Sequence, residues 1–227
     1  MSSDAGITAI ALFVRLPVPG RVKTRLAATI GEHAACQLYQ AMVADILVNI
    51  GASGLPLLLF HDEGDPRLLP DSWATAATTI SRQPPGDIGV RMAAAFAQCF
   101  ANGYEQVLLL GSDIPGIDGT VLAAANQALT DHDAVLLPTF DGGYGLIGLK
   151  HGYPHRPLFA GIAWSTDQVF ATTLERLHQV GYKPATLTMQ RDIDTLDDLR
   201  HYQRSPAPAA AFTNHCLAAM VAAGIIP

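Results

Sequence analysis

The chain has 227 residues, of which 49% are hydrophobic and 15% charged, so it can bury a sizeable core and is neither disordered nor a coiled coil. Its 20 acidic and 14 basic residues give a formal net charge of −6, which argues against a protein that binds mainly nucleic-acid phosphates. The three cysteines have no CxxC spacing, which argues against a disulfide framework or a structural zinc site.

The first residues of the chain do not resemble a targeting signal. No basic residue precedes the apolar run 7–14, and Arg15 and the turn 17–20 follow at once, so we expect no signal peptide. No apolar run approaches the roughly 18 residues of a membrane span. We therefore expect a cytoplasmic protein without a membrane partner.

Short apolar runs alternate with segments of helical periodicity along the chain. In chain order we expect a strand at 7–14, a helix at 32–50, strands at 55–60 and 78–82, a helix at 88–100, a strand at 106–110, a helix at 120–129, strands at 134–137 and 145–149, a helix at 166–180, a strand at 185–187, and helices starting at 195 and 209. Strands that alternate with helices predict an α/β fold, with a mostly parallel sheet covered on both faces.

A break rich in proline and alanine at 205–208 divides the chain into two parts. We expect residues 1–204 to form one domain, because nothing before the break resembles a linker. Residues 205–227 are expected to form an apolar helical extension. This extension would pack either on the same domain or on a partner subunit of a homodimer.

The loop after the first strand contains several basic residues and has a restrained backbone. Arg15, Arg21, Lys23 and Arg25 lie within eleven residues, two prolines stiffen the segment, and Gly20 permits a tight turn. Such a loop suits a di- or triphosphate, although the GxxxxGK[ST] order of a Walker loop is absent. The alternative is a solvated basic loop. As a loop on the surface, it is expected to add little to the stability of the fold.

Carboxylates follow the strand 106–110 and return near the end of the chain. Asp113 ends a strand of valine and leucine, where an unpaired carboxylate is costly, and Mg²⁺ bridged to a phosphate is a natural partner. Asp192 and Asp194 lie in a second acidic segment and are candidates for further metal ligands. The alternative for both segments is capping of a helix N-terminus, by Asp113 in the first segment and by Asp194 or Thr195 in the second.

Two glycine-bearing loops and a tryptophan complete the candidate residues. The segment 141–144 reads as a hairpin turn whose glycines let a ligand approach the backbone. The segment 85–91 runs from a loop into a helix and is suited to a base or ribose. Trp164 is either a core residue or the wall of a pocket. The eight histidines show no paired-ligand spacing.

The ordered motifs of the chain resemble those of a known family. They are PVPG-x-VKTRL, GDIGVRM, GSDIPG, DGGY-x-LIGL, WST and DIDTLDDL. This set resembles the DUF2064 family, also called radical-SAM/selenodomain-associated transferase 1. That family is similar to the GT-A nucleotide-diphospho-sugar transferases, a superfamily that includes nucleotidyltransferases. The resemblance spans about residues 7–199 and implies a Rossmann-like three-layer αβα sandwich with a mostly parallel mixed sheet.

The resemblance also implies roles for particular residues. The implied metal ligands for Mg²⁺ or Mn²⁺ are Asp113 and Asp194, with Asp192 as a helper, and the implied catalytic residues are Asp113, Lys23 and Arg25. The implied nucleotide and phosphate contacts are Arg15, Gly20, Lys23, Arg25, Asp87, Gly89 and Arg91. The implied acceptor contacts are Asp141, Gly142, Gly143, Tyr144 and Trp164.

Three functions are consistent with these residues. The first is a metal-dependent transferase with a nucleotide-diphosphate sugar as donor and a small-molecule acceptor. The second is a nucleotidyltransferase that couples an NTP to a small phosphorylated acceptor and releases pyrophosphate. The third is a nucleotide-binding protein without turnover, which the retained carboxylates and cations disfavour. Release of pyrophosphate rather than nucleoside diphosphate separates the first two.

Overall fold

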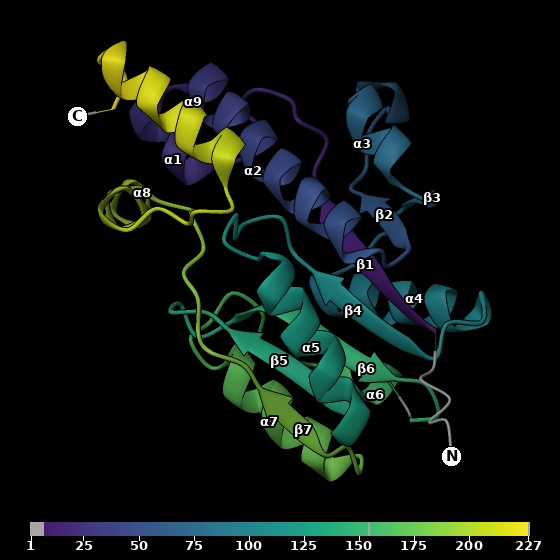
Figure 1. Cartoon of the computed structure of the whole chain (residues 1–227). Helices are drawn as coiled ribbons and strands as arrows, with labels where there is room; N and C mark the ends of the chain where they lie inside the picture. Colours follow the sequence, from purple (N-terminus) through teal and green to yellow (C-terminus); the bar gives the residue numbers. More distant parts are fainter. Residues whose placement is uncertain (1–6, 154, 227) are drawn as a thin grey trace.

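The computed structural model describes residues 7–153 and 155–226, and a seven-stranded sheet lies at its centre (Figure 1). The strands lie in the order β3-β2-β1-β4-β6-β5-β7. Their bounds are β1 Thr8–Val14, β2 Leu57–His61, β3 Thr79–Arg82, β4 Gln106–Leu110, β5 Ala134–Pro138, β6 Tyr144–Lys150 and β7 Pro184–Thr186. Only β6 runs antiparallel to its neighbours β4 and β5. The expected α/β fold with a mostly parallel mixed sheet is confirmed.

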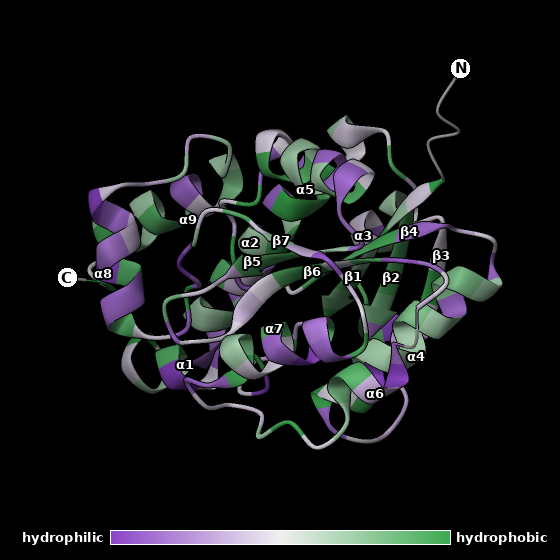
Figure 2. Cartoon of the chain, turned by 90° about the horizontal axis from the view of Figure 1, so that it is seen from below, coloured by the Kyte–Doolittle hydropathy of each residue, from purple (hydrophilic) through white to green (hydrophobic). Residues whose placement is uncertain are grey.

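Helices cover both faces of this sheet. Their bounds are α1 Thr24–Ile30, α2 Glu32–Ser53, α3 Asp71–Ala76, α4 Ile88–Ala101, α5 Gly119–Asp131, α6 Arg156–Phe159, α7 Val169–Gln179, α8 Leu196–Arg204 and α9 Ala211–Ala222. One apolar cluster packs α2, α3 and α5 on one face, and a second packs α4, α6 and α7 on the other. Figure 2 shows the apolar strands between these two layers. Within the described residues, no helix combines the length and the apolar character needed to cross a membrane.

The interior strand β1 shows why its sequence is apolar apart from Thr8. All seven of its residues are buried. Ile10 and Leu12 pack into the cluster with α2, whereas Ala11 and Phe13 pack into the cluster with α4. Strands that are covered on both faces read as continuous apolar runs rather than as an alternation. The run 7–14 therefore marks a strand in the interior of the sheet.

The C-terminal helix α9 packs against α2 of the same chain (Figure 1). Leu217 and Met220 of α9 join Leu38 and Met42 of α2 in a third apolar cluster. At the start of α9 the carboxylate of Asp45 accepts hydrogen bonds from the backbone N–H groups of residues 212 and 213, at 2.9 and 2.8 Å. Of the two packing partners expected for the extension, the structure shows the body of its own chain.

The contact between Asp45 and α9 gives a test of whether 205–227 folds as one unit with the domain. Asp45 is 1% exposed, so Asp45→Ala leaves two backbone donors without their charged acceptor. We expect the free energy of unfolding to fall by about 2–4 kcal/mol. Asp118 caps α5 from a half-exposed position, and Asp118→Ala should cost about 1 kcal/mol. Chemical denaturation followed by circular dichroism measures both. Equal losses of unfolding free energy in the two variants would show that the packing of α9 adds little to the stability of the domain.

Candidate active site

A cleft of about 590 Å³ lies where the carboxyl ends of the parallel strands meet. Ligands of open α/β sheets bind at this edge, because loops rather than side chains of the core surround it. Its walls come from the ends of β1, β2 and β4, from the hairpin between β5 and β6, and from the segments 164–169 and 192–194. Residues that are far apart in the sequence therefore share one cavity.

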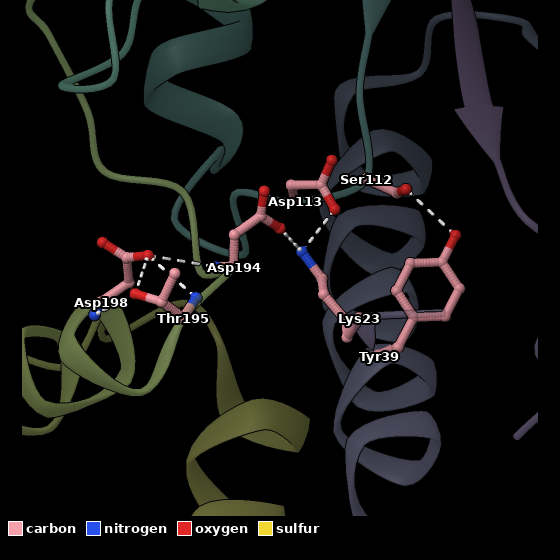
Figure 3. Close-up of polar contacts among 7 residues, drawn as sticks. All are labelled: Lys23, Tyr39, Ser112, Asp113, Asp194, Thr195 and Asp198. Atoms are coloured by element: carbon pink, nitrogen blue, oxygen red, sulfur yellow. Dashed lines mark hydrogen bonds and ion pairs between the residues drawn. The ribbon is translucent and has the colours of Figure 1, made fainter. Parts of the chain in front are cut away.

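Lys23 reaches inward from the loop after β1 and joins two carboxylates (Figure 3). Its Nζ atom lies 2.5 Å from Oδ1 of Asp113 and 2.8 Å from Oδ1 of Asp194. The Lys23 side chain is only 3% exposed, whereas those of Asp113 and Asp194 are 48% and 39% exposed. From the sequence, Lys23 is expected to be a cation on an open loop. The structure corrects this, because the ammonium group is buried between its partners and, unlike Asp113 and Asp194, Lys23 does not line the cleft.

Local structure holds the three members of this cluster in place. Lys23 precedes α1 with φ 47° and ψ 45°, a left-handed conformation that is costly for a residue with a side chain. The backbone N–H of Ile193 donates to the carbonyl of Asp113 at 3.0 Å. Thr195 and Asp198 form a reciprocal capping box at the start of α8 (Figure 3), which fixes the backbone beside Asp194.

The charge of Lys23 is maintained by its partners. Burial alone would lower the pKa of Lys23, but the adjacent carboxylates of Asp113 and Asp194 outweigh that effect and hold the pKa above its ordinary value. The group is therefore an ammonium cation at neutral pH. Two half-exposed carboxylates and one buried cation carry a net charge of −1 at the edge of the cleft.

Tyr39 of α2 ties together the two loops that flank the cleft. Its hydroxyl accepts a hydrogen bond from the backbone N–H of Arg15 at 2.8 Å and lies 3.1 Å from Oγ of Ser112 (Figure 3). Burial raises the pKa of Tyr39 far above its ordinary value, so the phenol stays neutral. The sequence analysis missed Tyr39 and Ser112, because a tyrosine on the apolar face of a helix reads as a core residue.

The cations that face the cleft differ in part from those expected. Arg15 and Arg91 line the cavity as expected. Arg21 lines it as well, although the sequence analysis gave it no separate role. Arg25 is exposed on α1 and lies outside the lining, so its assignment to phosphate binding and catalysis is corrected. Gly20 has φ +78° and forms the expected tight turn.

Two residues expected near the nucleoside have structural roles instead. Asp87 caps α4, because its carboxylate accepts a hydrogen bond from the backbone N–H of Val90 at 2.9 Å. Gly89 lies so close to Trp164 that a Cβ atom there would come within 2.6 Å of the indole ring. Neither residue lines the cleft, so their predicted contact with a nucleoside finds no support in the structure.

Gln83 was not expected and lines this part of the cleft. It is 7% exposed, and its side-chain amide donates to the carbonyl of Phe60 at 3.0 Å. Its Oε1 atom lies 3.5 Å from Nη1 of Arg91. Gln83 directly follows β3. Only the rule that ligands of α/β sheets bind at the carboxyl ends of the strands could have indicated it from the sequence.

The hairpin between β5 and β6 forms the opposite wall. Asp141, Gly143 and Tyr144, three of the residues proposed to contact an acceptor, line the cleft. The carboxylate of Asp141 accepts hydrogen bonds from the Thr139 hydroxyl at 2.6 Å and from the Gly143 backbone at 3.0 Å, and so shapes the turn. Gly142 lies outside the lining, and its carbonyl accepts from the backbone N–H of residue 170 at 2.8 Å. Its expected contact with an acceptor is corrected to a contact with the start of α7.

Trp164 also lines this side of the cleft, so the structure favours the pocket wall over the core. The following residue, Ser165, has φ +64°, a second left-handed residue beside the cavity. The lining of this half, as far as the structure describes it, contains the carboxylates of Asp141 and Asp192 and lacks lysine and arginine. Burial, together with the negative charges of Asp141 and Asp194, raises the pKa of Asp192 to about 6.

Asp113 and Asp194 fit a divalent cation as a pair. Mg²⁺ binds one or two carboxylates together with phosphate oxygens and water, and the two residues already share one cation, the Lys23 ammonium. Lys23 uses only their Oδ1 atoms, and within the described chain no hydrogen bond engages either Oδ2 atom. Across the same residues, no three histidine, cysteine or acidic side chains gather tightly enough to hold a metal. The expected third ligand, Asp192, is therefore not part of this group.

Comparison with known proteins agrees with this fold. A family model described as "Uncharacterized protein conserved in bacteria (DUF2064)" matches residues 47–166. A crystal structure from Desulfovibrio desulfuricans G20, provisionally described as a nucleotide-diphospho-sugar transferase, is 31% identical with a TM-score of 0.82. That similarity covers 94% of this chain and 96% of the other.

Two further proteins resemble the chain more distantly. A curated relative, 3-phospho-D-glycerate guanylyltransferase of Phenylobacterium zucineum strain HLK1, is 28% identical over 141 residues, which are 60% of this chain. The match spans 65% of that relative's length. A cytidylyltransferase structure from Leptospira borgpetersenii serovar Hardjo-bovis, strain JB197, is 14% identical with a TM-score of 0.58 and covers 97% of each chain. At that identity the likeness concerns the fold alone.

The buried position of Lys23 predicts an effect on stability. In Lys23→Met, two carboxylates would face each other without their cation. We expect the free energy of unfolding to fall by about 1–3 kcal/mol, less than for a fully buried pair because both carboxylates are half-exposed. Arg25→Met removes an exposed cation two residues away and should stay within about 0.5 kcal/mol of the parent. Equal effects in denaturant titrations would place Lys23 on an open loop after all.

Proposed function

The chain belongs to the DUF2064 family, and on that premise we propose that this transferase is a nucleotidyltransferase, which couples an NTP to a small phosphorylated acceptor and releases pyrophosphate. The observation that carries the proposal is the convergence of Lys23, Asp113 and Asp194 at a cleft that also holds Arg15 and Arg21. Transfer of a nucleotidyl group is catalysed mainly by positioning phosphates and neutralising their charge.

The curated relative bears on the choice between the two transferase functions. From the sequence, transfer from a nucleotide-diphosphate sugar is the first expectation and nucleotidyl transfer the second. The 28% identical relative is a guanylyltransferase, which favours the second function. The provisional description of the Desulfovibrio protein keeps sugar transfer as the other candidate. Binding without turnover is disfavoured, because the cleft retains both its cations and its carboxylate pair.

The two halves of the cleft suit the two substrates. Arg15, Arg21 and Arg91 lie on the side of β1 to β3, where they can bind the phosphates of the NTP. The acceptor would enter on the side of β5 and β6, beside Tyr144 and Trp164. Because Asp141 and Asp192 on that side would repel an anion, the acceptor phosphate would have to point toward the arginines and the metal site. An oxygen of the acceptor phosphate would form the new bond to the α-phosphorus, while the bond from the α-phosphorus to the bridging oxygen breaks and pyrophosphate leaves.

The residues of the chain have separate roles in this reaction. Asp113 and Asp194 would hold Mg²⁺ or Mn²⁺. The bound metal would neutralise part of the negative charge of the phosphates. The ammonium of Lys23 and the guanidinium of Arg21 would stabilise charge on the departing pyrophosphate. The attacking phosphate oxygen is already ionised at neutral pH, so the reaction does not require a general base from the cleft.

Product analysis tests the proposed reaction. Each of the four NTPs would be offered with Mg²⁺ and 3-phospho-D-glycerate or another phosphorylated acceptor, and each nucleotide-sugar with the same acceptors. We expect pyrophosphate and an acceptor-nucleotide product from one NTP, with loss of turnover in Asp113→Asn. Release of a nucleoside diphosphate from a nucleotide-sugar, without pyrophosphate from any NTP, would support sugar transfer instead.

Arg21 provides a test of the phosphate side of the cleft. It lines the cavity as an exposed side chain, so Arg21→Gln removes a cation without disturbing the core. We expect nucleotide affinity to fall by about five- to thirtyfold, as for a lost charge-assisted hydrogen bond of about 1–2 kcal/mol. Arg25→Gln, the same change outside the cleft, should alter the affinity less than twofold. Calorimetric titration with the NTP compares them, and a larger effect at Arg25 would contradict the assignment.

A further inference from the structure

The ammonium of Lys23 lies between the two carboxylates that are suited to a divalent cation. We propose that Lys23 is a resident counter-ion, which disfavours binding of a divalent cation to Asp113 and Asp194 until the phosphates of a nucleotide draw the ammonium away. The inference rests on the proposed function, because it takes both the carboxylate pair and the phosphate-binding loop from it. If the inference is right, Asp113 and Asp194 bind a divalent cation more tightly when nucleotide is bound than when it is absent.

The contacts of Lys23 explain the competition. Its Nζ atom engages one oxygen of each carboxylate, at 2.5 and 2.8 Å, so two of the four oxygens are taken. A divalent cation on the two remaining Oδ2 atoms would lie next to a buried positive charge, which repels it strongly at low dielectric. Without nucleotide, the protein itself thus neutralises one of the two negative charges of the carboxylate pair.

The position of Lys23 explains how a nucleotide would relieve the competition. Lys23 does not itself line the cleft, but both of its carboxylate partners do, and its loop also carries Arg15 and Arg21. Phosphates bound at those arginines and near the carboxylate pair would offer its flexible side chain a new partner. The phosphates offer an alternative acceptor to the ammonium and additional oxygens to the divalent cation. Nucleotide and divalent cation should therefore bind with positive coupling, and the coupling should be reciprocal.

Mn²⁺ binding without nucleotide tests the inference directly. Calorimetric titration would compare the parent with Lys23→Gln, which removes the charge and keeps hydrogen-bond donors for both carboxylates. We expect Lys23→Gln to bind Mn²⁺ at least tenfold more tightly than the parent and to gain more in Tm on adding Mn²⁺. Arg25→Gln, a loss of the same charge outside the cleft, should bind Mn²⁺ within twofold of the parent.

A second measurement uses the parent protein and so does not depend on the folding of a variant. The chain has three lysines, Lys23, Lys150 and Lys183. Labelling with acetic anhydride followed by mass spectrometry gives the rate at Lys23 relative to the other two. We expect slow labelling of Lys23 in the free protein, and faster labelling when Mn²⁺ alone is raised to saturation and displaces the ammonium from the carboxylates.

The outcomes separate this inference from the proposed function. Equal Mn²⁺ affinity of the parent and Lys23→Gln, or a labelling rate of Lys23 that Mn²⁺ does not change, would overturn the role of Lys23 alone. Tighter Mn²⁺ binding by the parent in the presence of GTP, with a smaller gain in Lys23→Gln, would support both. Absence of Mn²⁺ binding in every protein, with and without GTP, would overturn the role of Asp113 and Asp194 as well.

Discussion

One buried ammonium group joins three segments that are far apart in the sequence. Lys23 lies at the start of α1, Asp113 follows β4, and Asp194 precedes α8. A buried charge is costly unless it is paired, so the loop after β1 has to lie where both carboxylates can reach it. Tyr39 then connects the same loop to Ser112. These contacts connect the loop after β1 to the segments after β4 and before α8, and residues of all three segments line the cleft.

The main elements of the sheet could be predicted from the sequence because their residues are apolar at strand length. Strands β1, β4 and β5 lie at the predicted runs 7–14, 106–110 and 134–137, with differences of at most one residue at their ends. The short helices α1, α3 and α6 were missed. A helix of seven residues or fewer carries little periodicity, and none of the three has a side-chain cap at its start.

The candidate site could be predicted where the end of a strand identified it. Asp113, Arg15 and Tyr144 follow or begin strands, and the structure brings all three to the cleft. The direction of a side chain could not be predicted, so Lys23 and Arg25 looked equivalent although one is buried and the other exposed. Lys23 lies just before α1 in a left-handed conformation and Arg25 lies on α1, and no spacing rule indicates either backbone conformation.

The left-handed backbone at Lys23 also limits what evolution or engineering can do at this position. Glycine or asparagine adopts that conformation at lower cost, so either residue would favour the loop. Neither carries the positive charge that the two carboxylates require. Arginine keeps the charge, but its planar fork needs more room than a compact ammonium in a space that is 3% exposed. At this one residue, a more stable loop and a working site are competing demands.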